Sequence, residues 1–230
     1  MDKILIMLQL QNQLNDSTNG EEWTKGTTKN GKLINWKRCI YMECAEMIDS
    51  FSWKHWKNID ADPDWDNLQI EVVDVWHFIM SLAIENYSIN LRGGIEDLGI
   101  EISNLPSFSN INTTSDTFAS QNEVIEKVEN IMSIALSRSD LDLESLVSEF
   151  FDLVIMSGLD LDTLYRLYVG KNILNQFRQD NGYKDGSYIK VWNGDEDNVV
   201  MKRIWEEDSD IKPEYLYKEL SKNYLSLKKS

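Results

Sequence analysis

Apolar residues recur at helical spacing along most of this sequence. The clearest stripe has five members at i, i+4, i+7, i+8 and i+11: Ile40, Cys44, Met47, Ile48 and Phe51. We expect the helix that carries it to cover about residues 35–57. Strand patterns are scarce, with YIKVW at 188–192 as the single short candidate. The spacing therefore predicts an all-α fold.

A second long helix follows almost at once. Pro63 and Asp64 mark its start, and Arg92-Gly93-Gly94 marks its end. It is apolar on almost all sides, so it should be buried. Further helices are expected over residues 2–15, 121–138, 143–158 with Asp140 as its cap, 161–180 closed by Asn181-Gly182, 196–207 and 213–228.

The segment at about 90–120 connects the second long helix to the helix expected over 121–138. It is polar and irregular, and we predict a variable polar loop or lid there. Only 3 Pro and 11 Gly occur in 230 residues, and 42% of the residues are hydrophobic. A chain of this kind forms a core of its own without a hinged second body. We expect a single helical-bundle domain over residues 1–230.

The net charge of the chain limits the kinds of molecule that it can bind. With 23 Lys and Arg against 39 Asp and Glu, the formal net charge is −16. That average field repels nucleic acids and anionic membranes, so neither is expected as a partner. The cysteines Cys39 and Cys44 would not face each other on a helix, which argues against a disulfide and favours a cytoplasmic location. Neither a signal peptide nor a membrane span is evident.

Two acidic pairs stand out on the two long helices. Glu43 and Glu46 are three residues apart on the first, and Glu71 and Asp74 are three apart on the second. The short connector makes these helices packed neighbours, and an antiparallel pair would bring all four carboxylates together. Oxygen-only ligands of this kind favour Mg²⁺ or Mn²⁺.

The alternative is that both pairs are merely solvated helix faces, which is the usual meaning of Glu-x-x-Glu. Seven acids and no Lys or Arg occur between residues 58 and 91, whereas solvated helix faces mix the two signs. A di-iron site is a second alternative, because Asp74-x-x-His77 is similar to the Glu-x-x-His of di-iron bundles. That motif should occur twice, and the chain has 2 His in all.

A basic segment follows near the end of the helix predicted over 161–180. From residue 166 to 190 there are five bases and two acids. Lys171, Asn175 and Arg178 recur at i, i+4 and i+7, and Tyr183 and Lys184 follow in a glycine turn. Such a face suits phosphate oxygens. The alternative is an ordinary helix C-terminus, where basic side chains interact favourably with the negative end of the helix dipole.

Four segments closely resemble the dimeric deoxyuridine triphosphatases of the all-α nucleoside-triphosphate pyrophosphohydrolase superfamily. They are QNQLND, NWKRCIYMECAEMIDSFSWKHWKN, EVVDVWHFIMSL and YVGKNILNQFRQDNGYKDGSY. The resemblance covers most of the chain and thins between about 92 and 140 and in the last 30 residues. It implies a homodimer that hydrolyses dUTP to dUMP and pyrophosphate and so keeps uracil out of DNA, with dUTP or dUDP as the small-molecule substrate.

The resemblance also implies roles for individual residues. Glu43, Glu46, Glu71 and Asp74 would bind Mg²⁺, and Glu43 would act as the general base for the attacking water. Phosphate and sugar contacts would come from Lys171, Asn175, Arg178, Tyr183 and Lys184. Uracil contacts would come from Gln11, Asn15, Trp53, His55 and Trp56, although the two tryptophans also suit a core position.

Two other functions remain open at this stage. One is a pyrophosphohydrolase for another nucleoside triphosphate, which would share every metal ligand and differ only in the base pocket. The other is a partner-binding protein on the same fold. Loss of a metal ligand would be typical of that class, and this sequence has all four acids.

Overall fold

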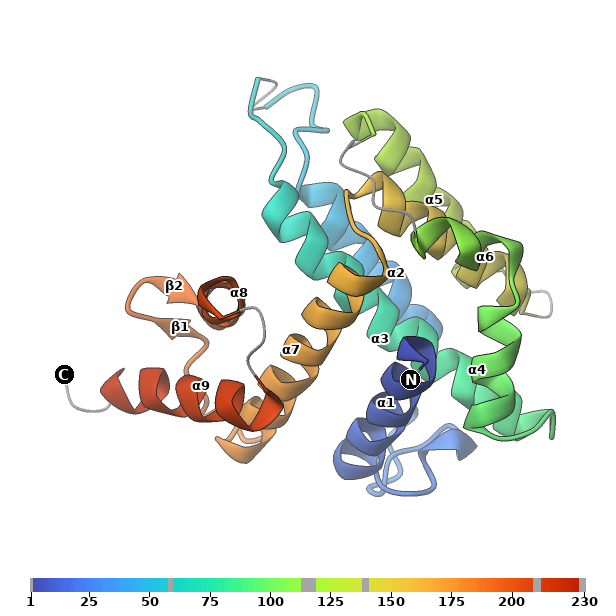
Figure 1. Cartoon of the computed structure of the whole chain (residues 1–230), viewed down its shortest axis with the longest axis horizontal. Coiled ribbons are helices and arrows are strands. Elements are labelled where there is room, and N and C mark those ends of the chain that lie inside the picture. Colours follow the sequence, from blue (N-terminus) through green and yellow to red (C-terminus); the bar gives the residue numbers. More distant parts are fainter. Residues whose placement is uncertain (1, 58–59, 113–118, 138–140, 209–211, 228–230) are drawn as a thin grey trace. The chain divides into compact units, whose positions relative to one another are not determined.

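The computed structural model describes residues 2–57, 60–112, 119–137, 141–208 and 212–227. Helices dominate it, which confirms the all-α prediction (Figure 1). The α-helices are α1 (Lys3–Asn19), α2 (Trp36–Asp49), α3 (Trp65–Ile89), α4 (Ile95–Ser103), α5 (Gln121–Leu136), α6 (Leu143–Met156), α7 (Leu161–Asp180), α8 (Asp197–Glu207) and α9 (Pro213–Leu227). The shorter elements are the 3₁₀ helices η1 (Trp23–Lys25) and η2 (Pro106–Asn112) and the strands β1 (Val191–Trp192) and β2 (Asp195–Glu196).

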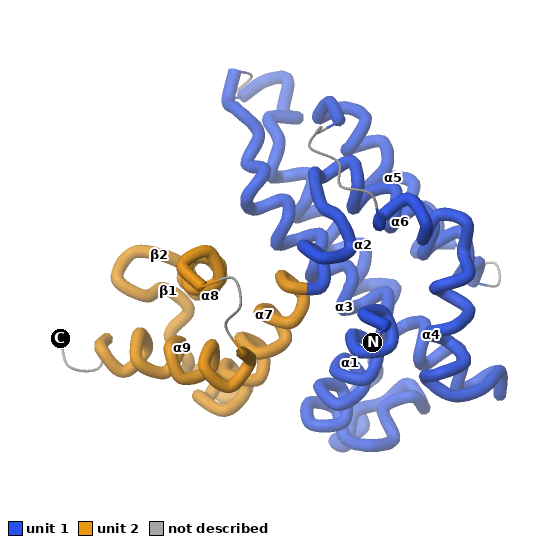
Figure 2. Tube along the Cα trace, viewed as in Figure 1, with its two compact units in different colours: residues 1–165 blue, residues 166–230 orange. Residues whose placement is uncertain are grey.

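The chain divides into two compact units, residues 1–165 and residues 166–230 (Figure 2). The expectation of one domain over 1–230 stays a prediction. Within the described residues, no helix is long and apolar enough to cross a membrane.

Helix α3 is the centre of the first unit. Its N-cap Asp64 accepts a hydrogen bond from the backbone N–H of Asn67 at 2.9 Å, which fixes the predicted start. Along its length α3 contacts α1, α2, α4 and α6, and it runs antiparallel to α2 (Figure 1). The Trp76 ring stacks on Phe150 of α6 with centroids 4.8 Å apart. The prediction of a buried second helix is therefore confirmed.

Helix α2 is shorter than predicted. It begins at Trp36, with Asn35 accepting from the backbone N–H of Arg38 at 2.8 Å, but it ends at Asp49 instead of near residue 57. The Asp49 carboxylate accepts hydrogen bonds from the Trp53 indole at 2.8 Å and the Lys54 ammonium at 2.9 Å. These contacts hold a loop after the helix. Phe51 is buried as the stripe predicts, although it lies beyond the helix end.

The prediction of a loop over 90–120 is wrong for most of that segment. It contains α4 and η2, while residues 113–118 lie outside the described residues. Helix α4 begins where the Asp97 carboxylate accepts from the backbone N–H of Gly94 at 2.8 Å. Leu98 and Ile102, four residues apart, turn inward and are buried.

A second correction concerns the start of α6. Its cap is Asp142, which accepts from the backbone N–H of Ser145 at 3.0 Å. The predicted cap, Asp140, lies outside the described residues.

The second unit forms around the C-terminal part of α7. Residues 191–192 of the predicted strand pair antiparallel with residues 195–196, so the strand is real but only two residues long. Phe177 of α7 packs edge-on against Trp192 at 5.8 Å and Tyr224 of α9 at 5.5 Å between ring centroids. These aromatic contacts join α7, the hairpin and α9.

Glu85 on α3 gives the first unit a measurable pH dependence. Burial raises the pKa of Glu85 from 4.5 to about 7. Between those values the folded state holds more protons than the unfolded state, so the free energy of unfolding should fall as the pH rises. Because the carboxyl is only half-buried, we expect a loss of about 1 kcal/mol between pH 4.5 and 8.

Urea unfolding at both pH values measures this loss. Glu85→Gln should remove most of the pH-dependent change, whereas Glu129→Gln, an exposed position on α5, should leave it in place. A Glu85→Gln protein with the same pH dependence as the parent would contradict the assignment.

Candidate active site

Three glutamates converge from two helices in the first unit. Glu43 and Glu46 lie one turn apart on α2, and Glu71 lies on the neighbouring α3. One carboxylate oxygen from each lies within 4.8 Å of the others. The antiparallel packing of α2 on α3 thus brings three of the four predicted acids together.

The burial of the three residues differs. Glu71 is only 8% exposed, Glu43 is half-buried, and Glu46 is exposed. The cluster therefore lies at the edge of the core with one side open to solvent. Asp74 follows Glu71 by one turn of α3 and is half-buried, but it is not a member of the group within 4.8 Å.

The donor set of the cluster fits a hard divalent cation. All of its members are carboxylates, and like charges at this separation favour a cation between them. Both nearby cysteines are free, and burial together with the charge of Glu43 raises the pKa of the Cys39 and Cys44 thiols. Protonated thiols are poor metal ligands, so the carboxylate oxygens are the donors that this cluster offers to a divalent cation.

The di-iron alternative gains no support from His77. In the part of the chain that the structure describes, the group of possible metal ligands holds three glutamates and no histidine. The His77 Nδ1 atom instead lies 2.6 Å from Oε1 of Gln11. With that amide orientation, Nδ1 carries the proton and donates to Gln11.

Gln11, Asn15, Ser81 and His77 form a buried polar network between α1 and α3. Gln11 Nε2 and Asn15 Nδ2 both donate to Ser81 Oγ, at 3.0 and 2.9 Å. Ser81 Oγ in turn donates to the backbone carbonyl of His77 at 2.8 Å. Gln11 and Asn15 are only 3% and 4% exposed. The two predicted uracil contacts thus lie in one network that fixes the orientation of their amides.

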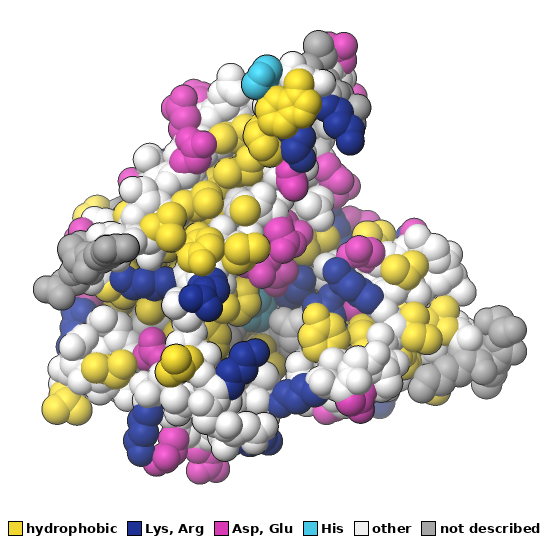
Figure 3. Space-filling model, turned by 180° about the vertical axis from the view of Figure 1, so that it is seen from behind, with side chains coloured by type: hydrophobic (Ala, Val, Ile, Leu, Met, Phe, Trp, Pro, Cys, Tyr) yellow, Lys and Arg dark blue, Asp and Glu magenta, His cyan; other side chains and the backbone are white. Residues whose placement is uncertain are grey.

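The two tryptophans that follow α2, Trp53 and Trp56, are on the surface and not in the core. Trp53 is 43% exposed and Trp56 is 64% exposed, and their rings meet edge-on at 5.7 Å. His55 lies against Trp56, with ring centroids 4.8 Å apart. Figure 3 shows hydrophobic side chains next to a histidine and basic side chains at this end of the first unit. Exposed aromatic faces are available for contact with a ligand.

Three of the five predicted phosphate residues, Lys171, Asn175 and Arg178, belong to one largely buried network in the second unit. Arg178 is 8% exposed and binds Asp197 with two parallel hydrogen bonds, Nε to Oδ2 at 2.8 Å and Nη2 to Oδ1 at 2.7 Å. Its Nη1 atom donates to Asn175 Oδ1 at 3.1 Å. The carboxylate of Asp197 is fully buried. The bidentate geometry holds the guanidinium in one plane.

Lys171 joins the same network through a different partner. Its Nζ atom donates to Asn198 Oδ1 at 2.9 Å, and that oxygen also accepts from Arg178 Nη2 at 3.2 Å. The Tyr188 hydroxyl donates to Asp197 Oδ2 at 2.7 Å. Burial and the hydrogen bond to Asp197 raise the pKa of Tyr188, which therefore stays protonated as a donor.

Asp197 and Asn198 were not predicted as partners of the basic residues, because the excess of bases was judged over residues 166–190 alone. The excess of bases there indicates an external anion, but Asp197 supplies an internal one seven residues further on. The Asp-Asn pair directly after the hairpin was the pattern that would have indicated it. Tyr183 and Lys184 lie outside the buried part, and the Arg178 guanidinium lies 5.8 Å from the Tyr183 ring centroid.

A comparison with protein families shows to which family the chain belongs. A family model described as dUTPase matches residues 3–183, which is most of the chain. The chain belongs to the dUTPase family. Its activity is hydrolysis of dUTP, and its helical structure is that of the all-α type. No curated protein sequence matches it.

The matched range divides the network of the second unit of this dUTPase. Lys171, Asn175 and Arg178 fall inside residues 3–183, whereas Asp197 and Asn198 fall outside. The residues that orient the basic side chains therefore come from a segment that the family model does not include.

Removing the carboxylate of Asp197 should destabilise this dUTPase strongly. Asp197→Ala removes the bidentate carboxylate partner of the buried Arg178 charge, and breaking a buried ion pair costs about 3–5 kcal/mol. Tyr188→Phe removes one hydrogen bond to the same carboxylate and should cost about 1.5–3 kcal/mol. Urea unfolding followed by circular dichroism measures both.

Asp195→Asn is the matched control. Asp195 is two residues away and pairs with Arg203 at 2.6 Å, but both side chains are about half exposed. That pair should contribute about 0.5 kcal/mol or less. Equal costs for the Asp195 and Asp197 substitutions would rule out the buried network as a stabilising element.

Proposed function

We propose that this dUTPase releases dUMP and pyrophosphate with the help of Mg²⁺ held by Glu43, Glu46, Glu71 and Asp74, and that Mn²⁺ can substitute. The observation that carries the proposal is the meeting of three glutamate side chains from α2 and α3 within 4.8 Å. An arrangement of like charges at the edge of a core costs energy unless a cation offsets it. Asp74 lies one turn from Glu71 and would complete the set.

The bound ion would offset the negative charge of the triphosphate and make a water molecule easier to deprotonate. The chain itself must then supply a proton acceptor. Glu43 suits this role because it is half-buried: it is less exposed than Glu46 and more exposed than Glu71. A carboxylate that is partly shielded from solvent is a better general base than an exposed one.

Phosphate binding belongs to the basic residues of the second unit in this proposal. Arg178 and Lys171 are fixed by Asp197 and Asn198, so their cationic groups have defined positions before a ligand arrives. Fixed donors lose less conformational entropy on binding than mobile ones. Asn175, Tyr183 and Lys184 would add contacts around the same chain segment.

Uracil recognition would use Gln11 and Asn15 together with the exposed aromatic residues Trp53 and His55. The network with Ser81 and His77 holds both amides in one orientation, which a site that distinguishes uracil from cytosine requires. A wrongly oriented amide would face the base with a donor in place of an acceptor.

Replacing Glu43 by Gln tests the general base. The substitution keeps the shape but removes both the proton acceptor and one anionic ligand, so kcat for pyrophosphate release should fall by about 100-fold or more. The control is Glu129→Gln, which removes one exposed carboxylate from α5. A Glu43→Gln enzyme within a few-fold of the parent would remove Glu43 from the mechanism.

The same assay run on dUTP, dTTP and dCTP, with and without Mg²⁺, tests the proposed function as a whole. Pyrophosphate should be released from dUTP in the presence of Mg²⁺, with much lower kcat/KM for the other two nucleotides. Comparable turnover of all three would instead identify a pyrophosphohydrolase of broad specificity.

Metal removal should be visible without substrate. Ligands that bind only the folded state stabilise it by mass action, so Mg²⁺ at a hundredfold excess over its Kd should raise the melting temperature by roughly 5 °C or more relative to EDTA. Glu71→Gln should abolish most of that shift, and Glu129→Gln should not change it. Equal shifts in the parent and in Glu71→Gln would mean that the three glutamates do not bind the ion.

We further infer that the active form is a homodimer, as in the enzymes that the sequence resembles, and that it works in the cytoplasm. Light scattering of the purified protein measures whether it is a dimer. A cytoplasmic location agrees with the two cysteines, which are both free and whose thiol pKa values are raised.

A further inference from the structure

A large pocket opens in the first unit between α1, η1, the end of α3 and the start of α4. Its volume is about 770 Å³, which is within the range of small-molecule sites. None of its lining residues belongs to the glutamate cluster or to the residues predicted to bind dUTP. The lining residues are Asn12, Asp16, Glu21, Trp23, Thr24, Ile84, Tyr87, Ser88, Leu91, Gly93, Gly94, Ile95 and Leu98.

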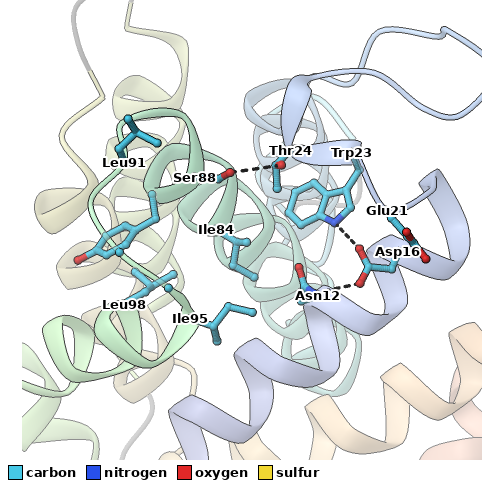
Figure 4. Close-up of a pocket in the computed structure, with 13 residues that line it drawn as sticks. Asn12, Asp16, Glu21, Trp23, Thr24, Ile84, Ser88, Leu91, Ile95 and Leu98 are labelled. Carbon is cyan, nitrogen blue, oxygen red and sulfur yellow. Dashed lines mark hydrogen bonds between the residues drawn. The ribbon is translucent and has the colours of Figure 1, made fainter.

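The pocket has one apolar wall and one acidic wall. Figure 4 shows Ile84 on α3, Ile95 and Leu98 on α4, and Leu91 in the turn between these helices. The opposite wall carries Asn12, Asp16 and Glu21, which come from α1 and the turn that follows it. A ligand that fills this pocket must therefore combine an apolar body with a group that suits carboxylates.

Asp16 is held in place at the acidic wall by neutral donors. Its Oδ1 accepts from the Trp23 indole at 3.0 Å, and its Oδ2 accepts from Asn12 Nδ2 at 3.1 Å (Figure 4). Burial raises the pKa of Asp16, and the neighbouring charge of Glu21 raises it further, against the opposing effect of the Trp23 hydrogen bond. Both the burial and the second carboxylate make an added cation favourable at this point.

The chain does not supply that cation from the residues that the structure describes. No Lys or Arg among them forms an ion pair with Asp16 or Glu21, and the lining contains neither. Two bases near the pocket have partners of their own: Lys25 pairs with Glu22, and Arg92 pairs with Glu101 and lies over the Tyr87 ring.

Leu91 at the pocket adds a second indication of a ligand. Its side chain is 92% exposed, and its backbone has a φ of 52°, which is unfavourable for a leucine. Positions of this kind are often found at ligand sites, where the exposed apolar surface is covered when the ligand binds.

We propose that this pocket binds a small organic amine whose apolar or aromatic body packs on Ile84, Leu91 and Leu98 and whose ammonium group lies between Asp16 and Glu21. Two carboxylates and no basic residue give the lining a charge complementary to such a cation. The site is separate from the dUTP residues, so it gives the protein a second ligand that need not be a nucleotide.

The test compares three probes with one indole body and different charges: tryptamine, neutral 3-ethylindole and anionic indole-3-propionate. Titration calorimetry and ¹⁵N-edited NMR should show tryptamine binding about tenfold more tightly than the anion, because two carboxylates attract one probe and repel the other. Amide shifts should map to Thr24, Gly93 and Gly94. Binding of all three probes with equal affinity, or no binding of tryptamine, would overturn the proposal.

Two substitutions locate the charge, and a third is their control. Glu21→Gln, at an exposed position, and Asp16→Asn should each weaken tryptamine binding by about threefold or more. Glu22→Gln removes the same charge from the adjacent exposed residue, which is paired with Lys25 and does not line the pocket, so binding should be unchanged. Equal weakening by Glu21→Gln and Glu22→Gln would mean a general field effect and no defined site.

A last arm separates this pocket from the nucleotide site and from a protein partner. A non-hydrolysable dUTP analogue at saturation should leave tryptamine binding in place, and direct displacement would reassign the pocket to the nucleotide. Tighter binding of N-acetyl-lysine methylamide than of tryptamine would assign it to a lysine side chain of another protein. Either of these two outcomes overturns the proposal of a small amine ligand.

Discussion

The organisation of the first unit depends on α3 being enclosed by other helices while carrying ionisable groups. Almost every face of this 25-residue helix is buried, and yet Glu71 sits in its first half at 8% exposure. A carboxylate in such a place is tolerated only with compensating partners. The packing of α2 alongside α3 adds Glu43 and Glu46 next to it. The helix pair that forms the core therefore also brings the three carboxylates together.

The helices could be predicted well where apolar residues alone determine them. The start and end of α7 were predicted to the residue, and those of α3 within a few residues, because capping and turn residues mark the ends of both helices. Prediction failed where side-chain contacts decide. Helix α2 ends early because Asp49 binds Trp53 and Lys54 beyond it, and α4 was missed because its short apolar stripe lies within a mostly polar segment.

The acidic cluster of the first unit was predictable, and the basic network of the second unit was predictable only in part. Residues three apart share one face of a helix, so the spacing, together with the short connector between the two helices, was enough to suggest that Glu43, Glu46 and Glu71 meet. Spacing also places Lys171, Asn175 and Arg178 on one face of α7. It says nothing about Asp197 and Asn198, which reach that face through the hairpin. Nor does spacing show that Gln11 and Asn15 donate to the same hydroxyl oxygen, that of Ser81, which lies on α3 and is far from them in the sequence.

The Arg178–Asp197 pair has a consequence for how the second unit assembles. The two residues are 19 positions apart in the chain, and Lys171 and Asn198 are 27 apart. The chain entropy lost on closing a loop grows only slowly with its length. The 28 positions from Glu43 to Glu71 place the acidic cluster in the same range. Each group of charges therefore forms within its own unit, and a unit whose contacts span moderate separations can form as its own segment of the chain is synthesised.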